Sequence, residues 1–157
     1  MKNLNITAKI QIYNYNELQP EEKKLIDCAK DACFRAYAPY SQFQVGAAVQ
    51  LANGAIVAGS NQENVAFPSG LCAERTALFY ANSQYPDQAV KSLAVAAYTQ
   101  GDFIERPISP CGACRQVILE TEIRFKCPVR IYLYGKTDIY IIEGIGDLLP
   151  LAFNSIE

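Results

Sequence analysis

The chain has 157 residues, half of them hydrophobic, so it is long enough to bury the core of roughly one domain. It carries 14 basic and 16 acidic residues and a net charge of -2, which disfavours both disorder and a nucleic-acid polymer as partner. Histidine is absent from the sequence. This absence excludes Ser-His-Asp and Cys-His catalytic pairs, histidine metal ligands and acid–base steps by an imidazole.

The N-terminus and the cysteines predict a cytoplasmic protein. Residues 1–6 lack the apolar core and cleavage site of a secretory signal, and no apolar run reaches the roughly 18 residues that span a membrane. Thiols stay reduced in the cytoplasm. We therefore expect the six cysteines to be buried small side chains, metal ligands or redox groups rather than disulfides.

The first part of the chain predicts an N-terminal extension followed by a helix. Residues 1–16 alternate weakly between apolar and polar side chains, which favours an extra edge strand or an ordered arm before a domain at residues 17–157. A helix is predicted to begin at Pro20, which is followed by two acidic residues, and to end before Pro39. Apolar residues at helical spacing place its two cysteines on the buried side.

The rest of the chain predicts alternating strands and helices. Residues 43–51 alternate with a period of two, and Asn53-Gly54 connects them in a tight hairpin to residues 56–58. The later elements are a helix near Cys72, a strand at 93–98, a helix with Ser109 as N-cap and Pro110 first, and strands at 129–134 and 139–142. This order predicts one three-layer α/β domain around a mixed sheet.

Two short segments carry the residues for chemistry, Cys72-Ala73-Glu74-Arg75 and Pro110-Cys111-Gly112-Ala113-Cys114-Arg115. Each lies in the first turn of a predicted helix, where the helix dipole favours the thiolate that binds metals. Cys111 and Cys114 are three residues apart, so on a helix they face the same way. Cys72 as third ligand would complete a Cys₃ zinc site whose fourth position is open, as in catalytic zinc sites. Glu74 lies nearby and can take a proton from water without binding the metal.

The Cys-x-x-Cys spacing alone leaves two non-catalytic interpretations open, a redox pair and half of a structural zinc site. A closed structural site needs a fourth ligand, and Cys127 is a candidate, although Pro128 and the strand that follows favour burial. Metal analysis separates these interpretations, because a non-catalytic module would hold no zinc, or zinc with no open position.

The two segments resemble those of the small homotetrameric cytidine deaminases, which are zinc-dependent. The resemblance extends over most of residues 20–153. It includes three further blocks: Tyr40-Ser41-Gln42-Phe43-Gln44-Val45-Gly46-Ala47-Ala48, Asn61-Gln62-Glu63-Asn64 and Leu148-Leu149-Pro150-Leu151-Ala152-Phe153. It implies a three-layer α/β/α fold with a mixed five-stranded sheet, one Zn²⁺ per subunit and a homotetramer. It also implies hydrolytic deamination of cytidine and 2′-deoxycytidine to uridine, 2′-deoxyuridine and ammonia, a reaction of pyrimidine salvage.

The resemblance also implies a role for each matched site residue. Cys72, Cys111 and Cys114 would bind zinc, and Glu74 would move protons between water, ring N3 and the departing amine. Five residues are implied in substrate binding. Phe43 would stack on the pyrimidine, and Asn61 and Glu63 would hold the ribose hydroxyls. The backbone of Ala73 would read the base edge together with Glu74, and Phe153 would come from a neighbouring subunit.

Charge gives Arg75 a predicted role. Zn²⁺ with three thiolates carries a net charge of −1, and two helix dipoles and a nearby cation would offset it. We expect Arg75 to donate hydrogen bonds to the thiolates, with Arg115 as the second candidate. The sequence departs from the family pattern at Gln44, at Val65 and at Phe67, where a tyrosine is common; the last change removes a hydroxyl.

Two other deaminase activities are alternatives to this interpretation. A deaminase for another aminopyrimidine, such as a nucleoside antibiotic, would share the fold, and a substrate panel would distinguish it. A polynucleotide deaminase is disfavoured by the net negative charge of the chain. The chain is also short, which leaves little room for a groove that binds a nucleic-acid strand.

Overall fold

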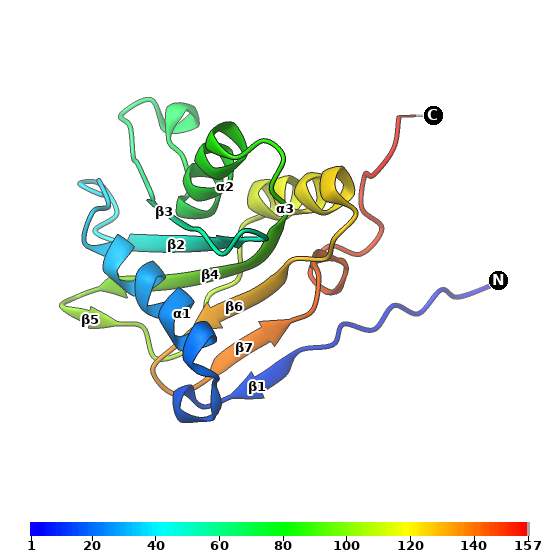
Figure 1. Cartoon of the computed structure of the whole chain (residues 1–157), viewed down its shortest axis with the longest axis horizontal. Coiled ribbons are helices and arrows are strands. Elements are labelled where there is room, and N and C mark those ends of the chain that lie inside the picture. The colour runs from blue at the N-terminus through cyan, green and yellow to red at the C-terminus, as the bar shows by residue number, and fades with distance from the viewer. Residues whose placement is uncertain (157) are drawn as a thin grey trace.

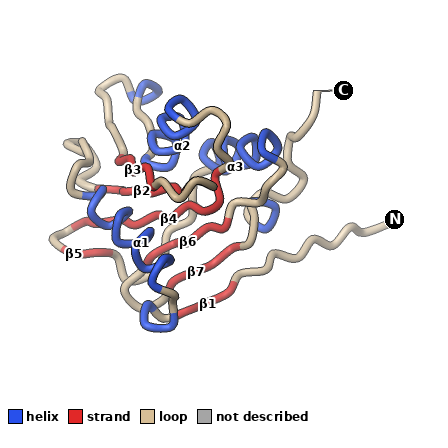
Figure 2. The backbone as a smooth tube through the Cα atoms, in the orientation of Figure 1, coloured by secondary structure: helices blue, strands red, loops and turns tan. Residues whose placement is uncertain are grey.

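A computed structural model describes residues 1–156 as a sheet between two layers of helices (Figure 1, Figure 2). The helices are α1 (Pro20–Cys33), α2 (Ala73–Gln84) and α3 (Gly112–Phe125). The strands are β1 (Gln11–Tyr13), β2 (Gln44–Leu51), β3 (Ile56–Ser60), β4 (Val90–Thr99), β5 (Asp102–Phe103), β6 (Arg130–Tyr134) and β7 (Ile139–Ile142). Helix α1 covers one face of the sheet, and α2 and α3 cover the other (Figure 1). The predicted three-layer α/β architecture is therefore confirmed.

The sheet is mixed and has the order β1-β7-β6-β4-β2-β3, with β5 paired to β4. Strands β4 and β6 run parallel, and the other described pairs are antiparallel. The parallel pair requires a crossover, which α3 provides between the two strands. The expected five strands are all present, and β1 and β5 raise the number in residues 1–156 to seven.

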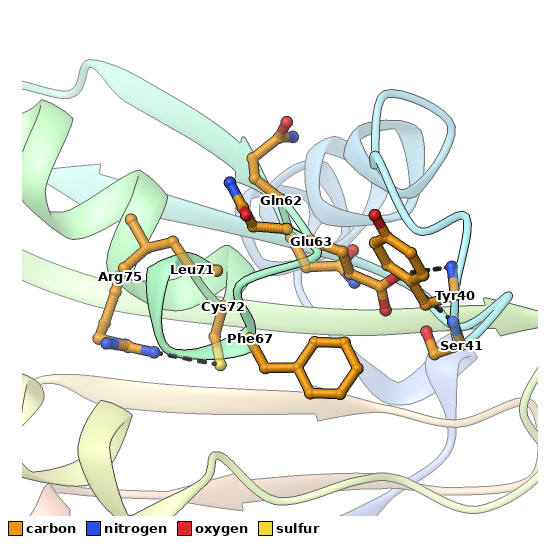
Figure 3. A pocket seen from close by; sticks show the side chains of 11 residues that line it. Tyr40, Ser41, Gln62, Glu63, Phe67, Leu71, Cys72 and Arg75 are labelled. Atoms are coloured by element: carbon orange, nitrogen blue, oxygen red, sulfur yellow. Dashed lines mark hydrogen bonds between the residues drawn. The ribbon is translucent and has the colours of Figure 1, made fainter.

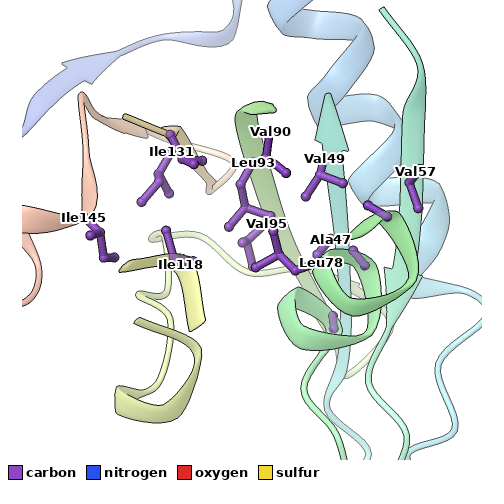
Figure 4. Packing of buried hydrophobic residues seen from close by; sticks show 14 of the residues in the cluster. Ala47, Val49, Val57, Leu78, Val90, Leu93, Val95, Ile118, Ile131 and Ile145 are labelled. Carbon is purple, nitrogen blue, oxygen red and sulfur yellow. The ribbon is translucent and has the colours of Figure 1, made fainter. Parts of the chain in front are cut away.

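Alternation along β4 divides the core into two layers. Leu93 and Val95 point to the face covered by α2 and α3, whereas Ala94 and Ala96 point to α1. Part of the first layer is shown in Figure 4. Its labelled members are Ala47, Val49, Val57, Leu78, Val90, Leu93, Val95, Ile118, Ile131 and Ile145.

Helix α1 packs closely on β2 because Gly46 has no side chain. A Cβ at this position would overlap the carbonyl oxygen of Ala29 and lie 2.6 Å from the backbone nitrogen of Cys33. Cys33 is fully buried in this contact, and its thiol lies 3.3 Å from the Ala96 carbonyl oxygen. Cys28 is half-buried, so the expected structural position holds fully for Cys33 and in part for Cys28.

The N-terminal segment adds a strand at one edge of the sheet. Gln11–Tyr13 pairs with β7 in antiparallel register, within residues 1–16, where the sequence favours an edge strand or an ordered arm. Residues 1–10 are exposed, and residues 1–8 run away from the body of the molecule as an extended arm (Figure 1). Among the described residues, no helix has the length and apolar character to cross a bilayer.

Candidate metal centre and substrate cavity

The three predicted zinc ligands lie at the N-termini of two neighbouring helices. Cys72 is the N-cap of α2, Cys111 is the N-cap of α3, and Cys114 is the third residue of α3. The prediction of Ser109 as N-cap and Pro110 as first helical residue is wrong, because α3 begins at Gly112. Cys111 has extended backbone dihedrals, and this N-cap conformation turns its side chain toward the third helical residue, where Cys114 lies.

The spacing of the three sulfurs fits one zinc ion. Cys111 Sγ lies 3.5 Å from Cys114 Sγ and 3.7 Å from Cys72 Sγ, and all three sulfurs are within 4.8 Å of one another. A tetrahedral zinc with Zn–S bonds of about 2.3 Å would separate its sulfurs by about 3.8 Å. The soft thiolate donors also suit zinc. The donor set therefore fits the metal in both chemistry and size.

No fourth protein ligand joins the three cysteines within residues 1–156. Cys127, the candidate for closing the site, follows the C-terminal end of α3 and lies against Lys91 instead. Since the 14 residues of α3 rise by about 1.5 Å each, Cys127 lies on the order of 20 Å from Cys111. The arrangement is thus the open type that leaves a coordination position for water or substrate.

Arg75 contacts the sulfur cluster as predicted. Its Nη2 lies 3.6 Å from Cys72 Sγ (Figure 3). The pKa of the Cys72 thiol falls to about 5, because Cys114 and then Arg75 hydrogen-bond to its thiolate. Arg115, the second candidate, points elsewhere and donates to the carbonyl oxygens of Pro110 and Leu148 and to the Ser109 hydroxyl.

Glu74 is buried beside the sulfur cluster. It is the second residue of α2, between Ala73 and Arg75, and only 5% of its surface is exposed. Burial raises the pKa of its carboxyl, and the negative charge of Cys72 raises it further. A raised carboxyl pKa brings Glu74 closer to the range in which acid–base catalysis can both take up and release a proton.

A cavity of about 550 Å³ opens next to Cys72 and Arg75 (Figure 3). Glu63 and Asn61 line it, as expected for the pair that would hold a sugar. Glu63 Oε2 accepts hydrogen bonds from the backbone N–H groups of Tyr40 (2.8 Å) and Ser41 (3.3 Å). Interactions with Ser41 and with these N–H groups hold the pKa of the Glu63 carboxyl below its usual value. The carboxylate is therefore charged and fixed in orientation.

The side-chain amide of Asn61 hydrogen-bonds to the backbone at the start of β2. Its Oδ1 accepts from the Val45 N–H at 2.8 Å, and its Nδ2 donates to the Phe43 carbonyl oxygen at 2.9 Å. One hydrogen of the amide nitrogen remains for a ligand. The same contacts hold the loop that carries Phe43 against the cavity wall.

Three predicted substrate residues, Phe43, Ala73 and Phe153, do not line this cavity. Phe43 is half-buried, and Phe153 is 70% exposed on the C-terminal segment, where its carbonyl oxygen accepts from Gln116 Nε2. Ala73 is buried as the first residue of α2. The sequence interpretation missed the wall formed by Tyr40 and Leu71. Tyr40 and Ser41 both lie in a block that matches the family, and this match was the signal that could have identified Tyr40 as a cavity residue.

Comparison with known proteins identifies the family. The family profile described as "Cytidine and deoxycytidylate deaminase zinc-binding region" matches residues 19–127, more than half of the chain. The chain belongs to the cytidine deaminase family. Zinc is therefore the metal of the site formed by Cys72, Cys111 and Cys114.

Individual relatives agree with this assignment. The cytidine deaminase of Halalkalibacterium halodurans is 42% identical over 138 residues, which cover 86% of this chain and 96% of the relative. The cytidine deaminase of Sporosarcina psychrophila is 42% identical over 140 residues, covering 84% and 90%. The crystal structure of the Burkholderia pseudomallei cytidine deaminase aligns with a TM-score of 0.71 at 42% identity and covers 83% of this chain and 97% of that one.

Proposed function

We propose that this chain hydrolyses cytidine and 2′-deoxycytidine to uridine, 2′-deoxyuridine and ammonia. The observation that carries the proposal is the buried carboxyl of Glu74 beside an open three-thiolate site. A cavity of nucleoside size lies next to that site. Membership of the cytidine deaminase family supports the same reaction.

Glu74 would perform the proton transfers. Zinc, when bound to the three cysteines, supplies a Lewis acid that makes water a stronger nucleophile at neutral pH. Glu74 would accept a proton from the attacking water and deliver it to ring N3 of the pyrimidine. It would then carry the second proton to the amino group, which leaves as ammonia. The raised pKa of the buried carboxyl suits both directions of transfer.

Glu63 and Asn61 would orient the sugar. The backbone N–H groups of Tyr40 and Ser41 donate to Glu63 Oε2, and the other carboxylate oxygen would accept from a sugar hydroxyl. Phe43 would stack on the base, and the backbone of Ala73 would read the base edge together with Glu74. These roles come from the family pattern, and the position of Glu63 in the cavity supports the sugar site.

The oligomer and the compartment are part of the proposal. Phe153 lies exposed on a segment held by Gln116, which would allow it to reach the site of a neighbouring subunit. We therefore propose a homotetramer with one zinc per subunit, acting in the cytoplasm on free nucleosides. Residues 17–157 would form the catalytic domain, and residues 1–16 an extension of it.

The test is to follow the ultraviolet absorbance of cytidine with purified protein of known zinc content. We expect conversion to uridine with release of one ammonia, loss of activity after a zinc chelator, and recovery when zinc is returned. A parallel panel of 2′-deoxycytidine, free cytosine and cytidine monophosphate tests the sugar site. Equal rates on free cytosine would contradict the role of Glu63, and no turnover of either nucleoside would overturn the proposed function.

A further inference from the structure

Lys91 and Cys127 form a pair outside the site described above. Lys91 Nζ lies 3.4 Å from Cys127 Sγ. Lys91 is the second residue of β4, and Cys127 lies between the end of α3 and the start of β6. The pair is thus at the opposite end of α3 from the zinc-binding cysteines. Neither residue has a part in the proposed deamination.

Among the described residues, Lys91 has one side-chain hydrogen-bond partner. Within residues 1–156, the Cys127 thiol is the hydrogen-bond partner of the Lys91 ammonium, and no carboxylate lies within salt-bridge distance of it. Lys136, by contrast, is held by two carboxylates. The lysine nitrogen and the cysteine sulfur therefore face one another without a competing anion.

The backbone holds both residues in place. Strands β4 and β6 are parallel neighbours, and Ser92 pairs with Arg130 in their ladder. Lys91 precedes Ser92 directly, and two residues separate Cys127 from the start of β6, so both lie at the same end of the strand pair. Cys127 is half-buried, which leaves its sulfur reachable by a small oxidant.

We propose that Cys127 and Lys91 form a reversible covalent crosslink when the protein is exposed to hydrogen peroxide. The thiol first reduces one peroxide molecule, which yields a sulfenic acid and one water. The Lys91 ammonium gives up a proton to the solvent, and the neutral amine then attacks the sulfur, so that an N–S bond forms and the S–O bond breaks. The hydroxyl leaves with one amine proton as water. The observed 3.4 Å separation lies within the roughly 3–3.5 Å at which positioned groups react.

The crosslink would join the ends of a segment that contains α3 and two zinc ligands. Closing such a loop restricts the unfolded chain, so the oxidised protein would unfold at a higher temperature than the reduced protein. Two equivalents of a small thiol would reverse the reaction, because the first attacks the sulfur and frees the amine, and the second releases Cys127 as a thiol.

The test uses the full zinc-loaded chain treated with peroxide and then analysed by intact mass and peptide mapping. We expect a product lighter by two hydrogens, a linked peptide pair containing Lys91 and Cys127, and full reversal by excess thiol. Lys91→Arg keeps the positive charge but lacks the primary amine, so it should stop at the sulfenic acid, which a cyclic diketone probe labels. Cys28→Ser is the matched control, because it removes another half-buried thiol and should leave the crosslink intact.

Three outcomes would overturn the proposal. One is a wild-type chain that gives only sulfenic or sulfinic acid at Cys127. The second is a crosslink that persists in Lys91→Arg or disappears in Cys28→Ser. The third is a linked product with an unchanged unfolding midpoint. These outcomes are independent of deamination, which should be unaffected by Lys91→Arg before peroxide is added.

Discussion

Three cysteine sulfurs within 4.8 Å concentrate negative charge at one point of the molecule. Among the described residues, the guanidinium that touches them is that of Arg75, since Arg115 is occupied by Ser109, Pro110 and Leu148. The N-termini of α2 and α3 add partial positive charge at the same place. Arg75 thereby compensates for the absence of a neutral histidine ligand.

Replacing Arg75 should weaken zinc binding. Arg75→Gln removes the charge that stabilises the Cys72 thiolate, and the loss of such a partner typically lowers metal affinity about 10- to 100-fold. Competition with a chromophoric chelator measures this change. Arg106→Gln, at an exposed position, is the charge-matched control and should bind zinc like the wild type. Equal zinc affinity in the two variants would show that the contact has no electrostatic role.

Replacing Glu74 should remove turnover and retain the metal. Glu74→Gln preserves the size of the buried side chain but cannot transfer protons, so we expect activity to fall by about 100- to 10,000-fold. Zinc content should stay at the wild-type level, since Glu74 is not among the clustered ligands. Glu120→Gln, exposed on α3, serves as control. A Glu74→Gln enzyme within tenfold of the wild-type rate would contradict the proton-transfer role.

At the scale of elements, the contact between α1 and β2 depends on Gly46. Gly46→Ala would press a methyl group against the backbone of α1, and overpacking of this kind destabilises proteins by about 1–3 kcal/mol. Because backbone atoms cannot rotate away, we expect the upper end of this range. Urea unfolding measures the change. Gly146→Ala, which meets no atom within 4 Å, should differ little from the wild type.

The elements that were predicted correctly have strong local signals. The hairpin of β2 and β3 follows from period-two alternation around Asn53-Gly54, and α1 begins at Pro20 as expected. The strand β5 has two residues and exists because it pairs with the end of β4, which no local pattern indicates. The start of α3 was misplaced because Ser109 has the character of a cap but its hydroxyl accepts from Arg115 instead.

The site shows the same division between local and long-range information. Residue spacing links Cys111 with Cys114, whereas Cys72 lies 39 residues from Cys111 along the chain, and no local pattern joins the two. The packing of α2 and α3 on one face of the sheet brings the three sulfurs together. The roles of Phe43 and Phe153 remain predictions, because neither lines the cavity of this chain.

At the scale of the whole molecule, the N-terminal extension has two parts with different contacts. Residues 1–8 are exposed, and Lys9 makes one backbone hydrogen bond to Asp147 Oδ1 at 3.0 Å. The next residues join the fold, because β1 pairs with β7 and the Tyr15 hydroxyl donates to Asp27 at 2.7 Å. The extension is therefore an edge of the sheet with an arm attached to it.

Two truncations should separate these parts. Deletion of residues 2–8 removes exposed chain, so we expect the free energy of unfolding to change by less than about 0.5 kcal/mol. Deletion of residues 2–16 also removes β1 and the Tyr15 contacts, which uncovers the edge of β7, so we expect a loss of about 1–3 kcal/mol. Urea unfolding measures both changes in the free energy of unfolding. Cytidine turnover per folded molecule should match the wild type in both truncated chains, because the metal centre lies on α2 and α3. Equal stability of the two truncated chains would show that β1 contributes no stability to the sheet, and loss of turnover in the longer deletion would show that the catalytic domain begins before residue 17.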